Sequence, residues 1–267
     1  FRRIQQLNQI KLGGHKDWRM PNILELYSIS NLNLEDQGNW LSSQGFHSVQ
    51  KRYSYYWSST TSNLNAGNAY CLGMQLGWII TIEKDKDHDV IGPYATFSWF
   101  VIGVRSDKSG VIKLPKTGQK IKYHSGDDGD LQIGVALPEN RFVDNDNGTL
   151  IDKLTGLIWE KEPSEEKFTW ENAYNRIAEL NRKRFAGFSD WRLPNINELN
   201  SLNNYNYQLY SYLNKNGFKR ISNISYWSSS TAKNKYYAWY LRMTDSTINT
   251  ALKKDYITSV LAVRGGQ

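Results

Sequence analysis

Apolar positions in the second half of the chain predict two helices. They recur every three or four positions, at Trp170, Ala173, Tyr174, Ile177 and Leu180. This spacing places the side chains on one face of a helix. Thr169 precedes the stretch and can act as the helix N-cap, and Gly187 suits the end of the helix. A second helix is expected to run through Leu199 and Leu202.

Other stretches predict short strands. Residues 141–152 have the pattern of a strand, an Asn-Gly turn and a second strand. Residues 155–159 are expected to continue that second strand through a kink. After an aromatic, Asn-rich segment, the expected elements are strands at 226–229, 237–243 and 259–264, with a turn within 244–250.

These patterns occur twice, because the chain contains an internal repeat. The stretch HKDWRMPNILEL at 15–26 returns as FSDWRLPNINEL at 188–199, an offset of 173 residues. Further blocks match in the same order: 1–8 with 174–181, 56–60 with 226–230, 69–70 with 238–239, and 101–105 with 260–264. Several matching blocks in one order indicate a tandem duplication.

The repeated stretch joins a loop to the start of a helix. Its Asp-Trp-Arg tripeptide can anchor the loop by packing and charge, and the following Pro fixes φ. Asn and the Glu three residues later match a capping box. A buried Arg prefers a bidentate carboxylate partner, and for Arg192 either Glu198 or Asp190 can serve. We therefore interpret as a structural clamp the residues Asp17, Trp18, Arg19, Glu25, Trp57, Asp190, Trp191, Arg192, Glu198 and Trp227, with Arg105 and Arg264 joining the same networks.

The repeat divides the chain into three parts. We expect a first repeat at 1–107, a Gly- and Asp-rich linker at 108–138, and a complete second repeat at 139–267. The first repeat begins inside its first helix, so roughly 35 residues equivalent to 139–173 have no counterpart. We therefore expect that position 1 is not the natural start and that the first repeat lacks its opening hairpin.

Aromatic content and net charge indicate which classes of partner the chain favours. The chain carries 10 Trp, 17 Tyr and 9 Phe, and its net charge of +7 favours polyanionic partners such as sulfated glycans. Basic residues form only short clusters, which disfavours a nucleic-acid tail. No apolar run approaches the length of a membrane span.

Two features invite a chemical interpretation. Cys71 lies in an apolar and aromatic run, so we expect a small buried hydrophobe there instead of a nucleophile. The carboxylates of Asp127, Asp128 and Asp130 could hold calcium, although the spacing differs from an EF-hand and a solvated linker is the favoured interpretation.

Together these motifs resemble a bacterial family, typified by the C-terminal domain of the Legionella collagen-like adhesin. The resemblance rests on the Asp-Trp-Arg-Leu-Pro-Asn stretch, the Tyr-Trp-Ser-Ser block and the terminal Val-Arg-Gly-Gly. It implies an α+β, C-type-lectin-like fold in each repeat, with two helices, a small twisted and mostly antiparallel sheet, and long loops. It also implies an exported or surface protein used in adhesion, the founding member being linked to sulfated glycans.

The same scaffold is shared by oxidases of the formylglycine-generating type, but their chemistry does not carry over. The resemblance implies a pair of active-site cysteines for one type, and only Cys71 is present. The iron-dependent type needs a cluster of three histidines on a helix, whereas the histidines here are dispersed, at His15, His47, His88 and His124. The calcium-binding tripeptides of related lectins are also missing, and the similar letters Pro138, Glu139 and Asn140 stand in the wrong order.

Recognition residues are expected on the late strands and loops of the second repeat. Flat aromatic rings stack on sugar C–H faces, and Lys or Arg pairs with sulfate or carboxylate. The candidates are Tyr236, Tyr237, Trp239, Tyr240, Arg242, Lys253, Lys254 and Tyr256. The competing interpretation is that alternate residues, Tyr237, Trp239 and Leu241, belong to the core.

The sequence thus favours a non-enzymatic binding protein, secreted or on a bacterial cell surface, that recognises a glycan or protein through loops. It needs no cofactor, and calcium stays an open alternative. A second hypothesis is a structural subunit of an extracellular filament or surface assembly, in which a neighbouring copy completes the first repeat. An oxidase on the same scaffold is the third.

Overall fold

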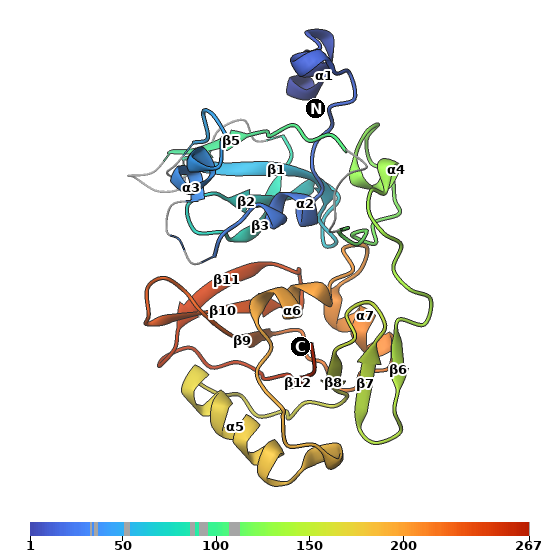
Figure 1. Cartoon of the computed structure of the whole chain (residues 1–267), viewed down its shortest axis with the longest axis vertical. Coiled ribbons are helices and arrows are strands. Elements are labelled where there is room, and N and C mark those ends of the chain that lie inside the picture. The colour runs from blue at the N-terminus through green and yellow to red at the C-terminus, as the bar shows by residue number, and fades with distance from the viewer. Residues whose placement is uncertain are drawn as a thin grey trace. The chain divides into compact units, whose positions relative to one another are not determined.

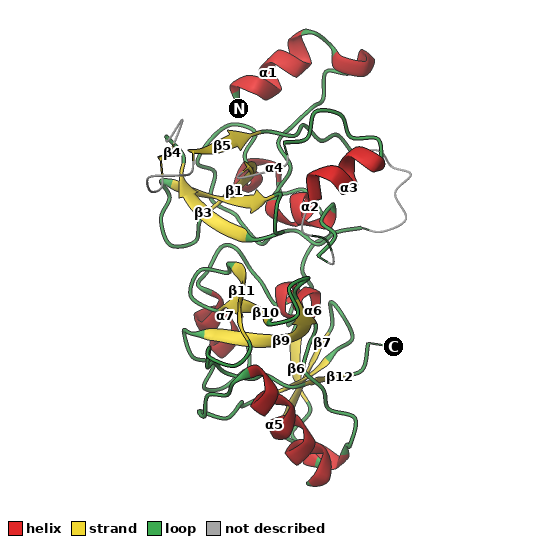
Figure 2. Ribbon diagram, turned by 90° about the vertical axis from the view of Figure 1, so that its left-hand side faces the viewer, coloured by secondary structure: helices red, strands yellow, loops and turns green. Residues whose placement is uncertain are grey.

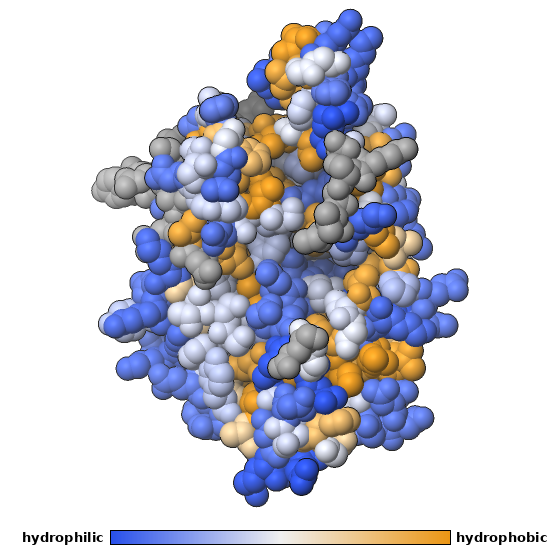
Figure 3. Space-filling view, in the orientation of Figure 1, coloured by the Kyte–Doolittle hydropathy of each residue, from blue (hydrophilic) through white to orange (hydrophobic). Residues whose placement is uncertain are grey.

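The computed structural model describes residues 1–32, 34, 37–50, 54–85, 89–90, 96–106 and 113–266. The chain forms two compact units, Phe1–Ala136 and Leu137–Gln267, which we describe separately (Figure 1). Both contain helices and antiparallel strand pairs, so the architecture is α+β, as predicted. On the face drawn in Figure 3, hydrophilic side chains predominate in each unit, with apolar patches among them.

Helices of the second unit follow the predicted pattern. The elements are α5 (Trp170–Arg182), the 3-10 turn η2 (Phe185–Gly187), α6 (Ile196–Ser201) and α7 (Leu209–Lys215). The Thr169 side chain accepts a hydrogen bond from Asn172 N, which confirms it as the N-cap of α5. Gly187 adopts φ +86°, a conformation that glycine takes without strain. Helix α7 lies inside the Asn-rich segment, where no helix was predicted.

Four short strands form one sheet of the second unit. Its members are β6 (Phe142–Asp144), β7 (Thr149–Asp152), β8 (Ile158–Glu160) and β12 (Val263–Arg264), in the order β12-β8-β7-β6. The predicted hairpin is confirmed, because β6 and β7 pair antiparallel. The predicted continuation of β7 through a kink is wrong, since β8 folds back antiparallel on β7. The Asp152 side chain accepts from Leu154 N, and Gly156 at φ +73° donates to Asp152 O, which closes a tight turn.

A second set of strands contains β9 (Ser225–Thr231), β10 (Tyr237–Arg242) and β11 (Ile248–Leu252). Strand β10 pairs antiparallel with both neighbours. Helix α5 packs its apolar face against this set (Figure 2), in a cluster with Trp191, Trp227 and Ala238. The stretch 244–250 contains the predicted turn, and its end begins β11, a strand that was not predicted.

The first unit repeats the arrangement of β9, β10 and β11 and of the helices that precede them. Its helices are α1 (Arg2–Gln9), η1 (Leu12–Gly14), α2 (Ile23–Ser28), α3 (Gln37–Ser43) and α4 (Asp128–Leu131). Its strands are β1 (Ser54–Thr61), β2 (Asn68–Gly73), β3 (Ile79–Glu83), β4 (Asp89–Val90) and β5 (Thr96–Phe100). Strand β2 pairs antiparallel with both β1 and β3, just as β10 pairs with both β9 and β11.

Local backbone irregularities occur at equivalent positions in the two units. Lys11 and Arg184 both precede a 3-10 turn in the left-handed conformation, at φ 52° and 49°. The register of β1 on β2 shifts between Trp57 and Thr61, and that of β9 on β10 shifts at the same place. Shared strain and shared bulges support the duplication beyond the matching letters.

The segment expected as a linker is part of the first unit. Its described residues, 113–136, fold onto β1 and contain α4, whose N-cap Asp127 accepts from Asp130 N. The Asp128 carboxylate is buried and accepts from the hydroxyls of Thr60 and Thr117, each at 2.7 Å. A Cβ on Gly129 would come within 1.9 Å of Ile121 O, so only glycine fits. The expectation of a solvated linker is therefore wrong for these residues.

Asp128 gives this segment a pH dependence. Burial raises the pKa of its carboxyl from 3.8 to about 6, because the charged form loses its hydration. A folded-state pKa above the unfolded one means that the contribution to stability is greatest below 3.8 and falls until about pH 6. The loss across this window is about 3 kcal/mol.

We predict that Asp128→Asn flattens this dependence. The variant should gain stability relative to the wild type as pH rises from 4.5 to 7.5, measured by urea unfolding followed by tryptophan fluorescence. A constant difference between the two proteins at both pH values would show that Asp128 does not titrate in this window.

Candidate functional site

The repeated Asp-Trp-Arg stretch forms a clamp at the start of α6. Arg192 Nη1 and Nη2 donate to the two oxygens of Glu198 at 2.7 and 2.6 Å. Glu198 also accepts from the backbone N of Asn195, whose side chain accepts from Glu198 N in return. Arg192 Nη2 reaches Gly265 O at 2.8 Å. The Arg192–Glu198 pair therefore holds together the loop, the start of α6 and the residue that follows β12.

Neighbouring contacts fix the rest of the loop. Arg264 donates to Asp190 at 2.8 and 3.1 Å and lies over the Phe188 ring, and this pairing lowers the pKa of Asp190. Trp191 is buried and donates from Nε1 to Phe185 O. Of the two partners considered for Arg192, the structure selects Glu198, while Asp190 binds Arg264.

The first unit contains the same clamp. Arg19 donates to both oxygens of Glu25 at 2.6 and 2.5 Å, and Arg105 donates to Asp17 at 3.1 and 3.3 Å. Trp18 donates from Nε1 to Leu12 O. Each predicted clamp residue thus binds or packs against its own unit, Trp57 against Trp99 and Trp227 within the α5 cluster. These contacts favour a structural role over ligand binding.

The structure divides the eight predicted recognition residues. Trp239 is 2% exposed, so its inclusion was wrong, because alternation along β10 turns it into the interior. Tyr237 is half-buried, while Tyr236 is exposed. Arg242 forms an ion pair with Asp245 at 2.9 Å. Four residues of the set, Tyr240, Lys253, Lys254 and Tyr256, stay half-buried or exposed around β10 and the loop after β11.

Two tyrosines form an aromatic stack. The rings of Tyr240 and Tyr256 are 5.2 Å apart at an interplanar angle of 24°. Both meet the buried Trp227 ring edge-on, at 6.2 and 5.5 Å. The Tyr256 hydroxyl contacts Ser225 Oγ at 3.1 Å. The stack therefore rests on a rigid base, and Tyr256 is 37% exposed to solvent.

A cation and a second aromatic pair continue this surface. Lys253 Nζ lies 3.8 Å from the Trp170 ring centre and donates to Thr231 Oγ1. Trp170 donates from Nε1 to Ser228 O at 2.8 Å and meets Tyr174 edge-on. Partial burial lowers the pKa of Lys253. We refer to this surface as the aromatic shelf; it consists of Trp170, Tyr174, Tyr240, Lys253 and Tyr256.

Sequence reasoning missed two members of the shelf. Trp170 and Tyr174 share the helical spacing of the buried residues of α5, so the sequence analysis placed both on the apolar face of that helix. Tyr174 is in fact 40% exposed, while Trp170 is half-buried against the cluster that contains Ala173. For Trp170, its position directly after the N-cap Thr169 was the available signal.

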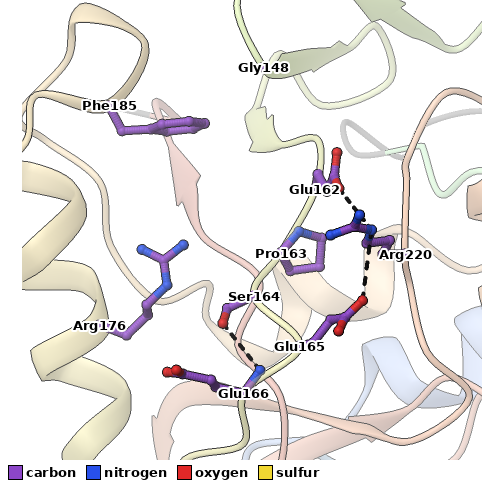
Figure 4. Close-up of a pocket in the computed structure, with 9 residues that line it drawn as sticks. All are labelled: Gly148, Glu162, Pro163, Ser164, Glu165, Glu166, Arg176, Phe185 and Arg220. Atoms are coloured by element: carbon purple, nitrogen blue, oxygen red, sulfur yellow. Dashed lines mark hydrogen bonds and ion pairs between the residues drawn. The ribbon is translucent and has the colours of Figure 1, made fainter.

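A cavity of about 540 Å³ lies elsewhere in the second unit (Figure 4). Its two cations are already paired, since Arg220 contacts Glu162 at 3.0 Å and Arg176 contacts Glu160 at 2.7 Å. Burial raises the pKa of Glu160 to about 7. Figure 4 shows Arg220 held between Glu162 and Glu165. Three glutamates on the lining make this cavity unsuited to a polyanion.

Other candidate chemistry is dispersed. Cys71 is fully buried, and burial raises the pKa of its thiol well above the ordinary value. Among the described residues, no three His, Cys, Asp or Glu side chains gather where they could hold a metal ion. Asp130 binds Lys122 and Gly126 N, while Asp127 caps α4. His88 lies outside the described residues.

The two clamps differ in burial, which gives a paired prediction. The side chains of Arg19 and Glu25 are each 13% exposed, whereas Arg192 is 40% exposed. Arg19→Met should cost roughly 2–3 kcal/mol of stability, because it leaves a largely buried carboxylate unpaired. Arg192→Met also leaves a largely buried carboxylate, Glu198 at 15% exposed, but water reaches the arginine side of this pair, so the expected cost is smaller, about 1–2 kcal/mol. Urea unfolding of both variants checks the order, with Arg182→Met, an exposed arginine, as control. Equal losses for all three would contradict the clamp.

Comparison with known proteins places the chain in a family. No curated protein sequence matches it. The family model described as the Lcl C-terminal domain matches residues 1–91 and 148–264, one region in each unit. Within the described residues, no helix is long and apolar enough to cross a membrane. Membership in this family indicates a surface or adhesin-like protein. The chain therefore belongs to the Legionella collagen-like protein C-terminal domain family and carries that domain as a tandem duplicate.

Proposed function

We propose that this chain is a non-enzymatic recognition module of an exported or surface protein, and that its second unit binds glycans, polyanionic ones included. The aromatic shelf is the observation that carries the proposal. It combines a stacked tyrosine pair from β10 and the loop after β11, an edge-on aromatic pair from α5, and a lysine that directly follows β11.

The shelf has the chemistry that sugar recognition needs. Aromatic faces pack against the C–H faces of sugar rings, and lysine ammonium groups pair with sulfate or carboxylate. Lys254 is exposed beside Lys253, so two positive charges lie at the edge of the shelf. Because Trp227 and Thr231 hold Tyr240 and Lys253 in place, binding would require little ordering of side chains.

The scaffold suits this role. We assign each unit a C-type-lectin-like fold, in which capped helices and small antiparallel sheets support long loops. The clamp immobilises the loop that carries the repeated stretch, so recognition is left to the strands and loops outside it. No catalytic step is proposed, since the buried Cys71 thiol is held in its protonated form by its surroundings.

Heparin binding tests the proposal. Lys254→Ala and Tyr256→Ala should each weaken binding of a heparin-derived oligosaccharide by about two- to five-fold, through loss of a partly screened ion pair or of a stacking face. The control is Lys215→Ala, which removes one exposed charge at the end of α7. Affinity is measured by isothermal titration at two salt concentrations, with and without a chelator.

The expected result is binding that weakens with salt and ignores the chelator. Wild-type protein that binds no heparin and no other glycan would overturn the proposal. Equal losses of affinity in Lys254→Ala and Lys215→Ala would show that heparin binding depends on the net charge of the protein. The shelf would then have no specific part in binding.

A further inference from the structure

The turn between β6 and β7 contains an Asn-Gly pair that the proposed function does not use. Asn147 and Gly148 are both exposed, and Gly148 adopts φ +88°. Asparagine followed by glycine is the dipeptide in which the side-chain amide reacts most readily, because glycine has no side chain to shield its backbone nitrogen. The sequence contains a second such pair, Asn216 and Gly217, at the end of α7.

The Asn147 side chain folds forward over the peptide that follows it. Its Oδ1 accepts a hydrogen bond from the Thr149 hydroxyl at 2.7 Å, two residues further along the chain. Asparagine side chains commonly bond forward in this way at turns. Because the bond spans Gly148, it turns the amide carbon Cγ toward the Gly148 backbone nitrogen. Among the described residues, none accepts a hydrogen bond from that nitrogen.

The Thr149 hydroxyl also polarises the Asn147 carbonyl. It accepts from Asn145 Nδ2 at 2.9 Å while it donates to Asn147 Oδ1, so the two bonds form one chain. Hydrogen bonds in a chain strengthen one another. Thr149 is fully buried, which holds this donor in place. A fixed donor at an oxygen on which negative charge develops stabilises the addition of a nucleophile to the carbonyl.

Asn216 is held in the opposite direction. Its Nδ2 donates to Tyr212 O at 2.7 Å, four residues back along α7. The side chain therefore points toward the preceding helical turn and away from Gly217. Its amide nitrogen, the group that would leave, is engaged by this bond. Asn216 is also half-buried. The two Asn-Gly pairs thus share their letters and differ in geometry.

We propose that Asn147 is a site of spontaneous deamidation in the folded protein. The Gly148 backbone nitrogen loses its proton to solvent and attacks Cγ of Asn147, which closes a succinimide ring. The bond between Cγ and Nδ2 breaks, and the amide nitrogen takes up a proton and leaves as ammonia. Water then opens the ring at either carbonyl and leaves aspartate or isoaspartate. The sequence of steps is a net hydrolysis and needs no oxidant or reductant.

Either product changes the hairpin. Both add a carboxylate to a turn that already carries Asp144 and Asp146, and Gly148 beside it lines the cavity of Figure 4. Isoaspartate also adds a methylene to the backbone between two paired strands, where Asp144 lies opposite Leu150. The modified turn therefore differs from the original in both charge and length.

A comparison of the two asparagines in the same protein tests the proposal. The full chain is incubated at pH 8 and 37 °C, and each asparagine is followed over time by digestion and tandem mass spectrometry. Asn147 should convert about fivefold faster than Asn216, or more. Synthetic peptides of residues 143–151 and 212–220 should convert at rates within about twofold of each other, because neither keeps the folded contacts.

Thr149→Val tests the activating hydroxyl, since valine keeps the shape of threonine. The variant should slow conversion of Asn147 several-fold and leave Asn216 unchanged. The matched control is Thr155→Val, which removes the hydroxyl of an exposed threonine that bonds Asp152 in another turn and should change neither rate. Circular dichroism establishes that each variant is folded.

Three results would overturn the proposal. The first is an Asn147 that stays an amide in the folded chain. The second is an Asn216 that converts equally fast there, or peptides that reproduce the same ratio, because local sequence would then explain the difference. The third is wild-type conversion of Asn147 in folded Thr149→Val. A ratio that appears only in the folded chain and falls in Thr149→Val supports the proposal.

Discussion

The Arg–Glu pair of each clamp is the interaction on which the fold depends. One carboxylate, Glu198, receives the guanidinium of Arg192 and the N-cap backbone of Asn195, and the same guanidinium reaches the last strand through Gly265 O. A bidentate geometry fixes direction as well as distance. Removal of Glu198 would leave a cation and a backbone donor unpaired together, which costs more than either bond contributes alone. The loop therefore serves as a rigid frame, and ligands are met by surfaces outside it.

Two copies of this frame have diverged where the frame does not constrain them. The second unit carries Tyr240 where the first carries Cys71, so only the second builds the tyrosine stack on its tryptophan. The first unit adds residues 113–136, anchored through Asp128 to Thr60 and Thr117. The duplication has kept the packing of the clamp and the strands, while the aromatic surface of the second unit differs from the first.

Sequence patterns predicted the parts of the fold that depend on local chemistry. Helix α5, its Thr169 cap and the hairpin β6–β7 follow from spacing and capping rules over a few residues, whereas the partner of Arg192 was left open between Glu198 and Asp190. The repeat then carried these predictions to the first unit. Strand β8 was misplaced because the Asp152 side chain and Gly156 reverse the chain within a stretch that reads as continuous strand.

The candidate sites were harder to predict, because they depend on burial that spacing does not encode. Trp239 and Tyr240 are both aromatic residues of the same predicted strand, but the Trp239 side chain faces the interior. Trp170 and Tyr174 share the spacing of the apolar face of α5, yet Trp170 is only half-buried and Tyr174 is 40% exposed. The acidic run around Asp128 was predicted to be a linker from its composition. In the folded unit, two threonines distant in sequence donate hydrogen bonds to the Asp128 carboxylate. In each case the deciding contact joins residues far apart in sequence.

Hydrogen exchange with a heparin-derived oligosaccharide tests most directly whether the frame and the recognition surface are separate. Backbone amides would be compared in the free and the saturated protein, with the clamp of the same unit as an internal reference. If the frame and the recognition surface are separate, new protection is expected in β10, β11 and the loop through Tyr256, with unchanged exchange at residues 188–198. Protection centred on Arg192 and Glu198, with none at the shelf, would show instead that the clamp itself is the binding site.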